Sequence, residues 1–309
     1  MSEAVVATSD SPAAEYLAGG TDLSERRRSG LSQGALIDVN ASPEMAGISW
    51  GSVGGAAIGS LTTIEALATD ARIASAYPGL AAAAVALATP QIRRQATVGG
   101  NLAQRTRCWY YRDPRTSCLK KGGSNCPART GNHLYGVIFD LGPCVAPHPS
   151  TLAVALLSYD AKIATDRRAG LTIGQLLGDG ANGAADNTLE NGELIKSVEL
   201  APPMVGERAL YKRAIARAYA EWPLVEVVVR AVIVDGAFQF VRLTAGGVAP
   251  VPIELTATAA AISGKAASPA NIARAAALSI HGAKPLKMTS YKLDLLKGLV
   301  QDLLERISS

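Results

Sequence analysis

Residues 89–150 read TPQIRRQATVGGNLAQRTRCWYYRDPRTSCLKKGGSNCPARTGNHLYGVIFDLGPCVAPHPS, and the interpretation of the whole chain depends on this stretch. It contains every cysteine of the protein, namely Cys108, Cys118, Cys126 and Cys144. It also opens on a glycine motif, TVGGNL at residues 97–102, and a related motif, AGGTDL, lies at residues 18–23. A chain that places all its thiols in one loop-rich segment indicates a functional segment there.

Length and composition set the first bounds on function. The chain has 309 residues, enough for two or three domains with their own cores, and 48% of them are hydrophobic. No apolar run reaches the roughly 20 residues that span a bilayer, so no membrane span is expected. The first residues lack a basic region followed by an apolar core, so we expect no signal peptide and a cytoplasmic location by default.

The basic side chains are unevenly distributed, with Asp113 as the only acid between residues 89 and 129. The basic residues of this segment are Arg93, Arg94, Arg105, Arg107, Arg112, Arg115, Lys120, Lys121 and Arg129. With the aromatic residues 109–111 among them, a nucleic-acid patch is one interpretation. The formal net charge of +4 is small for that role. Counter-charge for an anionic prosthetic group, or a partner surface, is the favoured interpretation, so no nucleic acid is expected as a partner.

The two glycine motifs suit a diphosphate. Glycine allows backbone N–H groups to approach and converge on an anion. Thr21 and Thr97 add hydroxyl groups, and Asn101 adds an amide. Neither motif is a Rossmann GxGxxG or a Walker loop with its lysine. Each motif alone is also compatible with an ordinary turn, and the pair is more informative than either.

The cysteine spacing leaves several kinds of site open. Structural zinc sites usually use close CxxC pairs, and here 9, 7 and 17 residues separate successive cysteines. Disulfides would suit an exported domain, for which no signal is seen. Four thiolates can hold a [4Fe-4S] cluster, and four unconnected cysteines remain the simplest alternative. The chain's histidines, His133, His148 and His281, form no catalytic set with serine or aspartate, so no catalytic side chain is predicted.

The order of elements predicts an α+β fold. Short strands are expected at 16–18, 36–39 and 52–59, and an alanine-rich helix at 77–88 that Pro90 stops. Pro202-Pro203 marks a plausible domain boundary. Beyond it we expect an apolar run at 222–234, a strand at 238–245, helices at 257–262 and 269–278, and a terminal helix at 293–307.

Three segments resemble the FAD-binding subunits of the xanthine dehydrogenase family of molybdenum hydroxylases. They are YLAGGTDL at 16–23, IGSLTTIEAL at 58–67 and TVGGNL at 97–102, and GGVAP at 246–250 resembles the start of that family's C-terminal domain. The resemblance implies an FAD-binding domain of the PCMH type, similar to vanillyl-alcohol oxidase, over residues 1–202. It also implies a C-terminal domain similar to that of the CO dehydrogenase flavoprotein over residues 203–309.

The same resemblance implies a set of FAD-binding residues. The backbone of the two glycine motifs would hold the pyrophosphate, and apolar side chains would line the flavin or adenine pocket. The full set is Leu17, Ala18, Gly19, Gly20, Thr21, Asp22, Leu23, Leu87, Ala88, Thr97, Gly99, Gly100, Asn101, Ser150, Ile195 and Lys212. The family often has Ser-Asp where this chain has Ser150-Thr151, which implies that a carboxylate near the flavin is absent here.

The stretch that contains the four cysteines, residues 103–150, is called the cysteine segment below. It makes the resemblance more specific, because it resembles the FAD subunit of bacterial three-subunit aldehyde oxidoreductases. The segments CWYYRD at 108–113, KGG at 121–123 and PCVAPHPS at 143–150 carry this likeness, and the β subunit of 4-hydroxybenzoyl-CoA reductase is a more distant relative. In both, an insert, here 103–147, holds a [4Fe-4S] cluster. The resemblance therefore implies Cys108, Cys118, Cys126 and Cys144 as its ligands.

The implied role is that of an electron-transfer subunit. Its partners would be a molybdenum-cofactor large subunit carrying molybdopterin and a small subunit carrying [2Fe-2S] clusters, with an external electron acceptor. Relatives are exported folded by a signal on the small subunit, so a periplasmic location is the alternative to the cytoplasm. Two other functions remain open: a stand-alone flavin oxidoreductase of the same fold, and a zinc-stabilised interaction module without catalytic activity.

Overall fold

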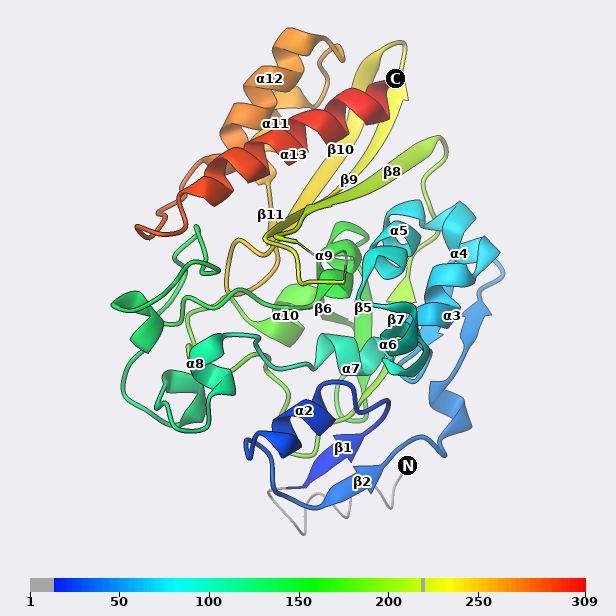
Figure 1. Cartoon of the computed structure of the whole chain (residues 1–309). Helices are drawn as coiled ribbons and strands as arrows, with labels where there is room; N and C mark the ends of the chain where they lie inside the picture. Colours follow the sequence, from blue (N-terminus) through cyan, green and yellow to red (C-terminus); the bar gives the residue numbers. More distant parts are fainter. Residues whose placement is uncertain (1–13, 218–219) are drawn as a thin grey trace.

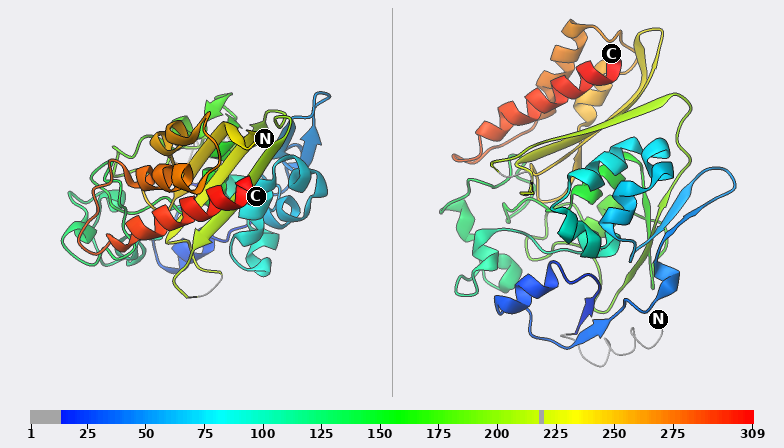
Figure 2. Two further views of the ribbon diagram at one scale, coloured as in Figure 1. Left: turned by 90° about the horizontal axis from the view of Figure 1, so that it is seen from above. Right: turned by 45° about the vertical axis from the view of Figure 1, so that its right-hand side comes forward.

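The structure is a computed structural model that describes residues 14–217 and 220–309 (Figure 1). Residues 1–13, which belong to the predicted first domain, lie outside the described part of the chain. The strands form a two-stranded, a five-stranded and a four-stranded sheet. Helices separate the two larger sheets, as two further views show (Figure 2).

The two-stranded sheet lies at the N-terminal end of the fold, at the bottom of Figure 1. It pairs β1 (Glu15–Leu17) with β2 (Leu36–Asp38) in parallel. A parallel pair needs a crossover, and α2 (Leu23–Arg28) supplies it. The AGGTDL motif is therefore the connection between β1 and α2.

The five-stranded sheet is antiparallel and has the order β3-β4-β7-β5-β6. Its strands are β3 (Ile48–Trp50), β4 (Ala56–Gly59), β5 (Lys162–Thr165), β6 (Leu171–Thr172) and β7 (Ile195–Leu200). Helices α9 (Thr151–Ser158) and α10 (Ile173–Leu177) share its apolar core. All of α9 except Leu157 is buried, which explains why its sequence TLAVALLS is almost entirely apolar.

Five short helices follow β4 and lead to the second glycine motif. They are α3 (Ile64–Thr69), α4 (Ala71–Ala76), α5 (Pro78–Ala86), α6 (Pro90–Gln95) and α7 (Val98–Leu102). The expectation that Pro90 ends the alanine-rich helix was wrong. That helix, α5, ends at Ala86, and Pro90 instead begins α6, where its missing N–H is not needed.

The cysteine segment forms a separate lobe between α7 and α9, at the left of Figure 1. Its regular structure is limited to α8 (Trp109–Arg112) and single turns of 3-10 helix at 119–121 and 127–129. Ala128, Val137 and Val145 make a small core of its own. With so little apolar burial, this lobe depends on polar contacts and ion pairs for its shape.

The C-terminal part has the antiparallel order β11-β10-β9-β8. Its strands are β8 (Glu207–Ala214), β9 (Val225–Val234), β10 (Ala237–Gly246) and β11 (Ile253–Glu254), and its helices are α11 (Thr256–Ile262), α12 (Pro269–Ala277) and α13 (Tyr291–Ser308). Helix α13 packs on β8 and β9, whereas α5 and α9 pack on the same sheet from the first domain (Figure 2). The sheet is thus covered from both parts of the chain.

The predicted α+β class is confirmed by this arrangement of antiparallel sheets and covering helices. A boundary at residues 202/203 stays a prediction. In the described ranges we find no helix with both the length and the apolar character that a bilayer crossing requires.

Candidate functional site

The two glycine motifs, 79 residues apart in sequence, lie against each other in space. A Cβ atom on Gly19 would be 1.7 Å from the carbonyl oxygen of Gln95, the last residue of α6. Gly20 has a φ of 68°, in the left-handed region that favours glycine. The first motif therefore reaches the chain just before Thr97 by direct backbone contact, which only glycine permits.

The first motif ends at the beginning of a helix, and the second begins at one. Asp22 precedes α2, and Thr97 precedes α7, where the Thr97 hydroxyl accepts a hydrogen bond from the Gly100 N–H at 3.1 Å. TVGGNL therefore forms the N-cap and the whole of α7, whereas the sequence had left an ordinary turn open as an alternative. The N–H groups at the start of α7 are already paired within the protein, because Val98 donates to the Thr62 carbonyl oxygen at 3.0 Å and Gly99 donates to the Ser60 carbonyl oxygen at 2.8 Å. A helix start still carries partial positive charge, which favours an anion such as a diphosphate.

A cavity of about 280 Å³ opens beside these helix starts. Of the predicted FAD-binding residues, those that line it are Thr21, Asp22, Leu87, Ala88, Gly100 and Asn101. Arg93 fixes the bend at residues 87 and 88 by donating hydrogen bonds to both carbonyl oxygens, at 3.1 and 3.3 Å. The structure therefore brings residues from the first glycine motif, from the end of α5 and from α7 to one cavity.

Ser150 is tied to this cavity through Asn101. Its hydroxyl donates to Asn101 Oδ1 at 2.6 Å and accepts from the Ala153 N–H at 3.0 Å, so that it also caps α9. Both side chains are buried. The end of the cysteine segment is thereby joined to the second glycine motif.

The other predicted residues do not line the cavity, and two of them, Ile195 and Lys212, lie in other surroundings. Ile195 is buried in the core at the start of β7. Lys212, on β8, forms an ion pair of 2.8 Å with Asp302 of α13. Its side chain therefore lies on the face of the sheet that α13 covers. Its neighbour Arg213 lines the cavity instead, because successive residues of a strand face opposite sides. The placement does not favour a flavin contact for Lys212.

Asp22 joins the first glycine motif to the cysteine segment. Its carboxylate pairs with Arg26 at 3.1 Å, with Arg107 at 3.0 Å and with Arg112 at 2.7 Å. Burial by itself would raise the pKa of Asp22, but Arg107 and Arg112 more than offset it and hold the pKa below its ordinary value. Arg107 and Arg112 flank Cys108 on both sides, so this ion-pair cluster positions the first cysteine.

All four cysteines line one small void of about 10 Å³, and all are free thiols. Backbone N–H groups of Tyr110 and Tyr111 are directed at the Cys108 sulfur. A hydrogen bond between the thiols of Cys126 and Cys144 lowers the pKa of Cys126 and raises that of Cys144. The segment therefore collects four sulfur donors, although they come from positions spread over 37 residues.

Over residues 14–217 and 220–309, no group of three or more His, Cys, Asp or Glu side chains is arranged to hold a metal ion. This finding does not distinguish a zinc site from a [4Fe-4S] cluster at the four cysteines. A group larger than a water molecule would require the loop to spread, because a cavity needs about 10–15 Å³ to hold one water and the void has about 10 Å³.

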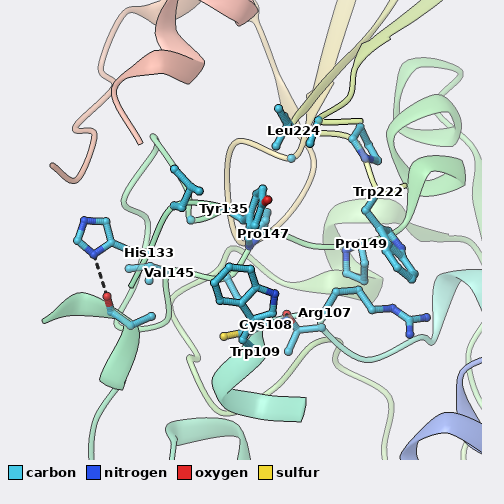
Figure 3. Close-up of a pocket in the computed structure, with 18 of the residues that line it drawn as sticks. Arg107, Cys108, Trp109, His133, Tyr135, Val145, Pro147, Pro149, Trp222 and Leu224 are labelled. Carbon is cyan, nitrogen blue, oxygen red and sulfur yellow. Dashed lines mark hydrogen bonds between the residues drawn. The ribbon is translucent and has the colours of Figure 1, made fainter. Parts of the chain in front are cut away.

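A second cavity of about 360 Å³ lies between the cysteine segment and the C-terminal domain (Figure 3). Trp109 and Tyr135 stand on its cysteine-segment side, and Lys292 and Glu226 come from the C-terminal domain. It shares five lining residues with the first cavity, namely Arg107, Pro149, Glu221, Trp222 and Pro223. Arg107 stacks on Trp222 at 4.5 Å, so this pair forms the wall between the two cavities.

Glu226 is the carboxylate that sequence reasoning missed. It accepts a hydrogen bond from the Tyr211 hydroxyl at 2.8 Å and also contacts the Thr151 side chain. Burial raises its pKa to about 7, although Tyr211, Thr151 and Arg213 each lower it. A carboxylate from β9 therefore lies next to Thr151, although it lines the second cavity and not the one beside the glycine motifs. In the sequence, the one sign of this carboxylate is that the apolar run 222–234 contains a glutamate.

Replacing Glu226 by Gln should make the protein more stable at neutral and alkaline pH. The folded pKa is raised from 4.5 to about 7, so the free energy of unfolding falls as pH rises through that interval. Gln cannot ionise and still accepts from Tyr211. We expect a gain of about 3 kcal/mol at pH 8, from 1.36 kcal/mol per tenfold change in proton affinity.

Urea unfolding of wild type and Glu226→Gln at pH 5 and pH 8 measures this effect. The gain should be clearly smaller at pH 5, where the wild-type carboxyl is largely protonated in the folded protein. Glu190→Gln, at an exposed pair with Arg167, is the matched control and should change little at either pH. An equal gain at both pH values would contradict the prediction.

The chain matches two protein-family profiles along its length. Residues 1–203 match the FAD binding domain in molybdopterin dehydrogenase. Residues 209–307 match the CO dehydrogenase flavoprotein C-terminal domain.

Curated relatives show the same likeness. The chain is 35% identical over 271 residues to the aldehyde oxidoreductase FAD-binding subunit PaoB of Escherichia coli (strain K12), covering 84% of this chain and 83% of PaoB. It is 37% identical over 103 residues to the putative xanthine dehydrogenase FAD-binding subunit XdhB of the same organism, covering 33% of this chain and 35% of XdhB.

Solved structures share the fold. Quinoline 2-oxidoreductase from Pseudomonas putida 86 superposes with a TM-score of 0.78 at 19% identity, covering 100% of this chain and 94% of that one. The Cu,Mo-CO dehydrogenase superposes with a TM-score of 0.77 at 18% identity, covering 99% and 94%. The predicted architecture, an FAD-binding domain followed by a domain of the CO dehydrogenase flavoprotein type, is confirmed.

Proposed function

The chain belongs to the family of FAD-binding subunits of molybdopterin dehydrogenases, and from that premise we propose that it is the FAD- and [4Fe-4S]-carrying subunit of an aldehyde oxidoreductase. In this role it receives electrons from a molybdenum-cofactor large subunit through a [2Fe-2S] small subunit. It passes them to an external acceptor. The aldehyde specificity follows the similarity to PaoB and resides in the partner.

The observation that carries the proposal is that both glycine motifs line one cavity. The Gln95 carbonyl leaves no room for a side chain on Gly19, so glycine lets the first motif lie against the end of α6, directly before the second motif. Backbone N–H groups there would hold the pyrophosphate, with Thr21 and Asn101 at its edge. The remaining predicted contacts, from Leu17, Ala18, Leu23, Gly99, Ser150 and Ile195, belong to the same proposal. FAD, when bound, supplies the ability to accept and release electrons singly or in pairs.

The cluster is proposed from the donor set. Four cysteines and no carboxylate line the shared void, which is the ligand set of a [4Fe-4S] cluster. Backbone N–H groups of Ala128, Arg129 and Val145 are directed at the Cys126 sulfur and would stabilise a ligated thiolate. Lys120, whose ammonium lies near Cys144, would offset part of the negative charge. The ligands proposed are Cys108, Cys118, Cys126 and Cys144.

Replacing Cys118 by Ser tests the cluster separately from the flavin. We expect the purified wild-type protein to contain about four irons per chain, and Cys118→Ser to lose them. FAD content should remain, because Cys118 does not line the 280 Å³ cavity. Ser124→Ala, an exposed serine of the same segment, is the control and should keep both.

Iron and zinc analysis with a visible spectrum provides the readout. Zinc in a protein without cluster absorption would refute the cluster and favour the interaction module. Iron that survives in Cys118→Ser would refute ligation by this residue. Substrate turnover by the isolated chain would favour a stand-alone flavin oxidoreductase.

The partners and the compartment are proposed from the relatives. Co-purification of this chain with a molybdenum subunit and a [2Fe-2S] subunit would support the heterotrimer. The cytoplasm is the proposed location, or the periplasm if the [2Fe-2S] partner carries an export signal. Fractionation of cells that express the complete complex distinguishes the two.

A further inference from the structure

The cavity between the cysteine segment and the C-terminal domain has no assigned ligand. Its volume of about 360 Å³ lies in the range of small-molecule sites, and it is larger than the cavity beside the glycine motifs. Its walls come from distant parts of the chain, including α8, the loop around Tyr135 and the start of α13 (Figure 3). These observations make it a preformed binding site in its own right.

Aromatic side chains shape this cavity. Trp109 is 53% exposed and Tyr135 is 42% exposed, which is unusual for rings of this size inside a folded lobe. Their centroids are 5.2 Å apart, and their planes are inclined by 80°. Two rings at right angles form a corner in which a third planar ring can stack on one face and meet the other edge-on. The corner therefore selects a flat aromatic molecule.

Lys292 adds a polar anchor to this corner. Its side chain is buried, and its ammonium donates to the carbonyl oxygens of Gly247 at 2.7 Å and Tyr135 at 3.1 Å. An ammonium has three hydrogens, so the charged form can also donate to an oxygen of a ligand. Burial lowers its pKa to about 7, so an added oxygen acceptor would stabilise the charged form. A carbonyl group on the planar ligand would meet this need.

The lining also argues against a nucleotide. The N–H groups at the start of α8, the helix that opens onto this cavity, are directed at the Cys108 sulfur. A nicotinamide dinucleotide would therefore lack the converging N–H groups that its diphosphate requires.

The position of the cavity points to electron transfer. Cys108 and Tyr110 line both this cavity and the void of the four cysteines. Arg107, Pro149 and Trp222 line both this cavity and the one beside the glycine motifs. A ligand here would lie next to both proposed redox centres.

We propose that this cavity binds a small quinone, which serves as the electron acceptor of the protein. The inference rests on the proposed function only for the source of the electrons. In the step, both quinone carbonyls become hydroxyl groups. They take up two electrons and two protons from the reduced flavin, which returns to its oxidised form. Trp109 and Tyr135 hold the ring, and Lys292 holds one quinone oxygen.

Equilibrium dialysis of 1,4-naphthoquinone against the purified, FAD-loaded protein tests the binding. We expect Trp109→Ala to weaken binding about tenfold, and Trp109→Phe to restore most of it, because a flat ring is the required feature. Trp50→Phe is the control. That ring stacks on Tyr77 in the first domain, so the change should leave binding as in wild type.

A second measurement follows reoxidation of the chemically reduced flavin by 1,4-naphthoquinone. The rate at low quinone concentration should fall in Trp109→Ala and recover in Trp109→Phe. Equal binding by wild type and Trp109→Ala would overturn the inference. Release of flavin into the dialysate on quinone addition would also overturn it, since the flavin ring would then fill the cavity. A protein that purifies without FAD would refute the proposed function, while dialysis would still test the cavity.

Discussion

Replacing Gly19 by Ala should cost the protein both stability and FAD. The new Cβ would lie 1.7 Å from the Gln95 carbonyl oxygen and 2.5 Å from its carbon, and neither atom belongs to a flexible side chain. The backbone of one motif must therefore move away from the other. Overpacking of this kind typically lowers the free energy of unfolding by 1–3 kcal/mol. Because the new Cβ meets backbone atoms, we expect a loss of about 3 kcal/mol or more here.

The effect on FAD should follow from the same displacement. The two motifs can line one cavity only while the first motif stays against the end of α6, directly before the second. We expect FAD binding to weaken by at least about tenfold, which corresponds to 1.4 kcal/mol. Thermal unfolding and FAD titration of the deflavinated protein measure the two effects separately.

Gly298→Ala is the matched control for this substitution. Gly298 lies inside α13, and a Cβ there would meet nothing within 4 Å. Alanine favours a helix over glycine by about 1 kcal/mol, so this variant should be slightly more stable and bind FAD as wild type does. Wild-type FAD affinity in Gly19→Ala would show that the contact between the motifs does not shape the cofactor site.

Replacing Asp22 by Asn should disturb the flavin cavity and the cysteine segment together. The carboxylate has side-chain exposure of only 14% and pairs with Arg26, Arg107 and Arg112, whose side-chain exposures are 11–18%. Asn keeps one acceptor oxygen but has no charge. The positive charges of the three guanidinium groups are then no longer balanced by the carboxylate. Breaking a buried pair typically costs 3–5 kcal/mol, and the retained oxygen places this change near about 3 kcal/mol.

The expected signature is a joint loss. Arg107 and Arg112 flank Cys108, and Arg112 also donates to the carbonyl oxygens of Arg105 and Thr106 at 2.9 and 2.8 Å. When these arginines lose their anchor, the segment around Cys108 should loosen, and both iron content and FAD content should fall. Asp113→Asn, in an exposed pair of the same segment, is the control and should leave both unchanged. Loss of FAD with full iron content would contradict the coupling.

The pH dependence gives an independent check. Because the folded pKa of Asp22 is lowered, its stabilising contribution is fully present above the ordinary value of 3.8 and is lost as pH falls through the folded pKa. Asp22→Asn should therefore show a flatter fall in stability on the acid side than wild type. An unchanged acid limb would mean that the carboxylate contributes nothing to folding.

Local sequence patterns predicted much of the fold and part of the site. The β1 strand, the α3 helix with its Thr63 cap and the terminal helix α13 were each readable from a few neighbouring residues. Pro90 was misread because proline both excludes a helix interior and favours a helix start. Only the structure shows which property applies, since Ala88 has a φ of 49° and α5 has already ended.

The cofactor residues show the same division. The glycine motifs were predicted to bind a diphosphate, which stays a prediction; the structure shows that Gly19 lies against the Gln95 backbone, where only glycine fits. Lys212 was named by resemblance, and one step along a strand reverses the face, so the register of β8 against β9 decides that Arg213 lines the cavity.

Sequence by itself determined the α+β class, the two glycine motifs and the single segment that carries every thiol, because each depends on residue type and local order. Tertiary structure alone decided that Asp22 joins the first glycine motif to the cysteine segment, and that Glu226 supplies a carboxylate next to Thr151. It also decided that four dispersed cysteines surround one void. These contacts join residues tens of positions apart, and no local pattern encodes such a distance. In residues 89–150, the sequence therefore specified the chemistry, and the packing of that stretch against the rest of the chain specified its arrangement.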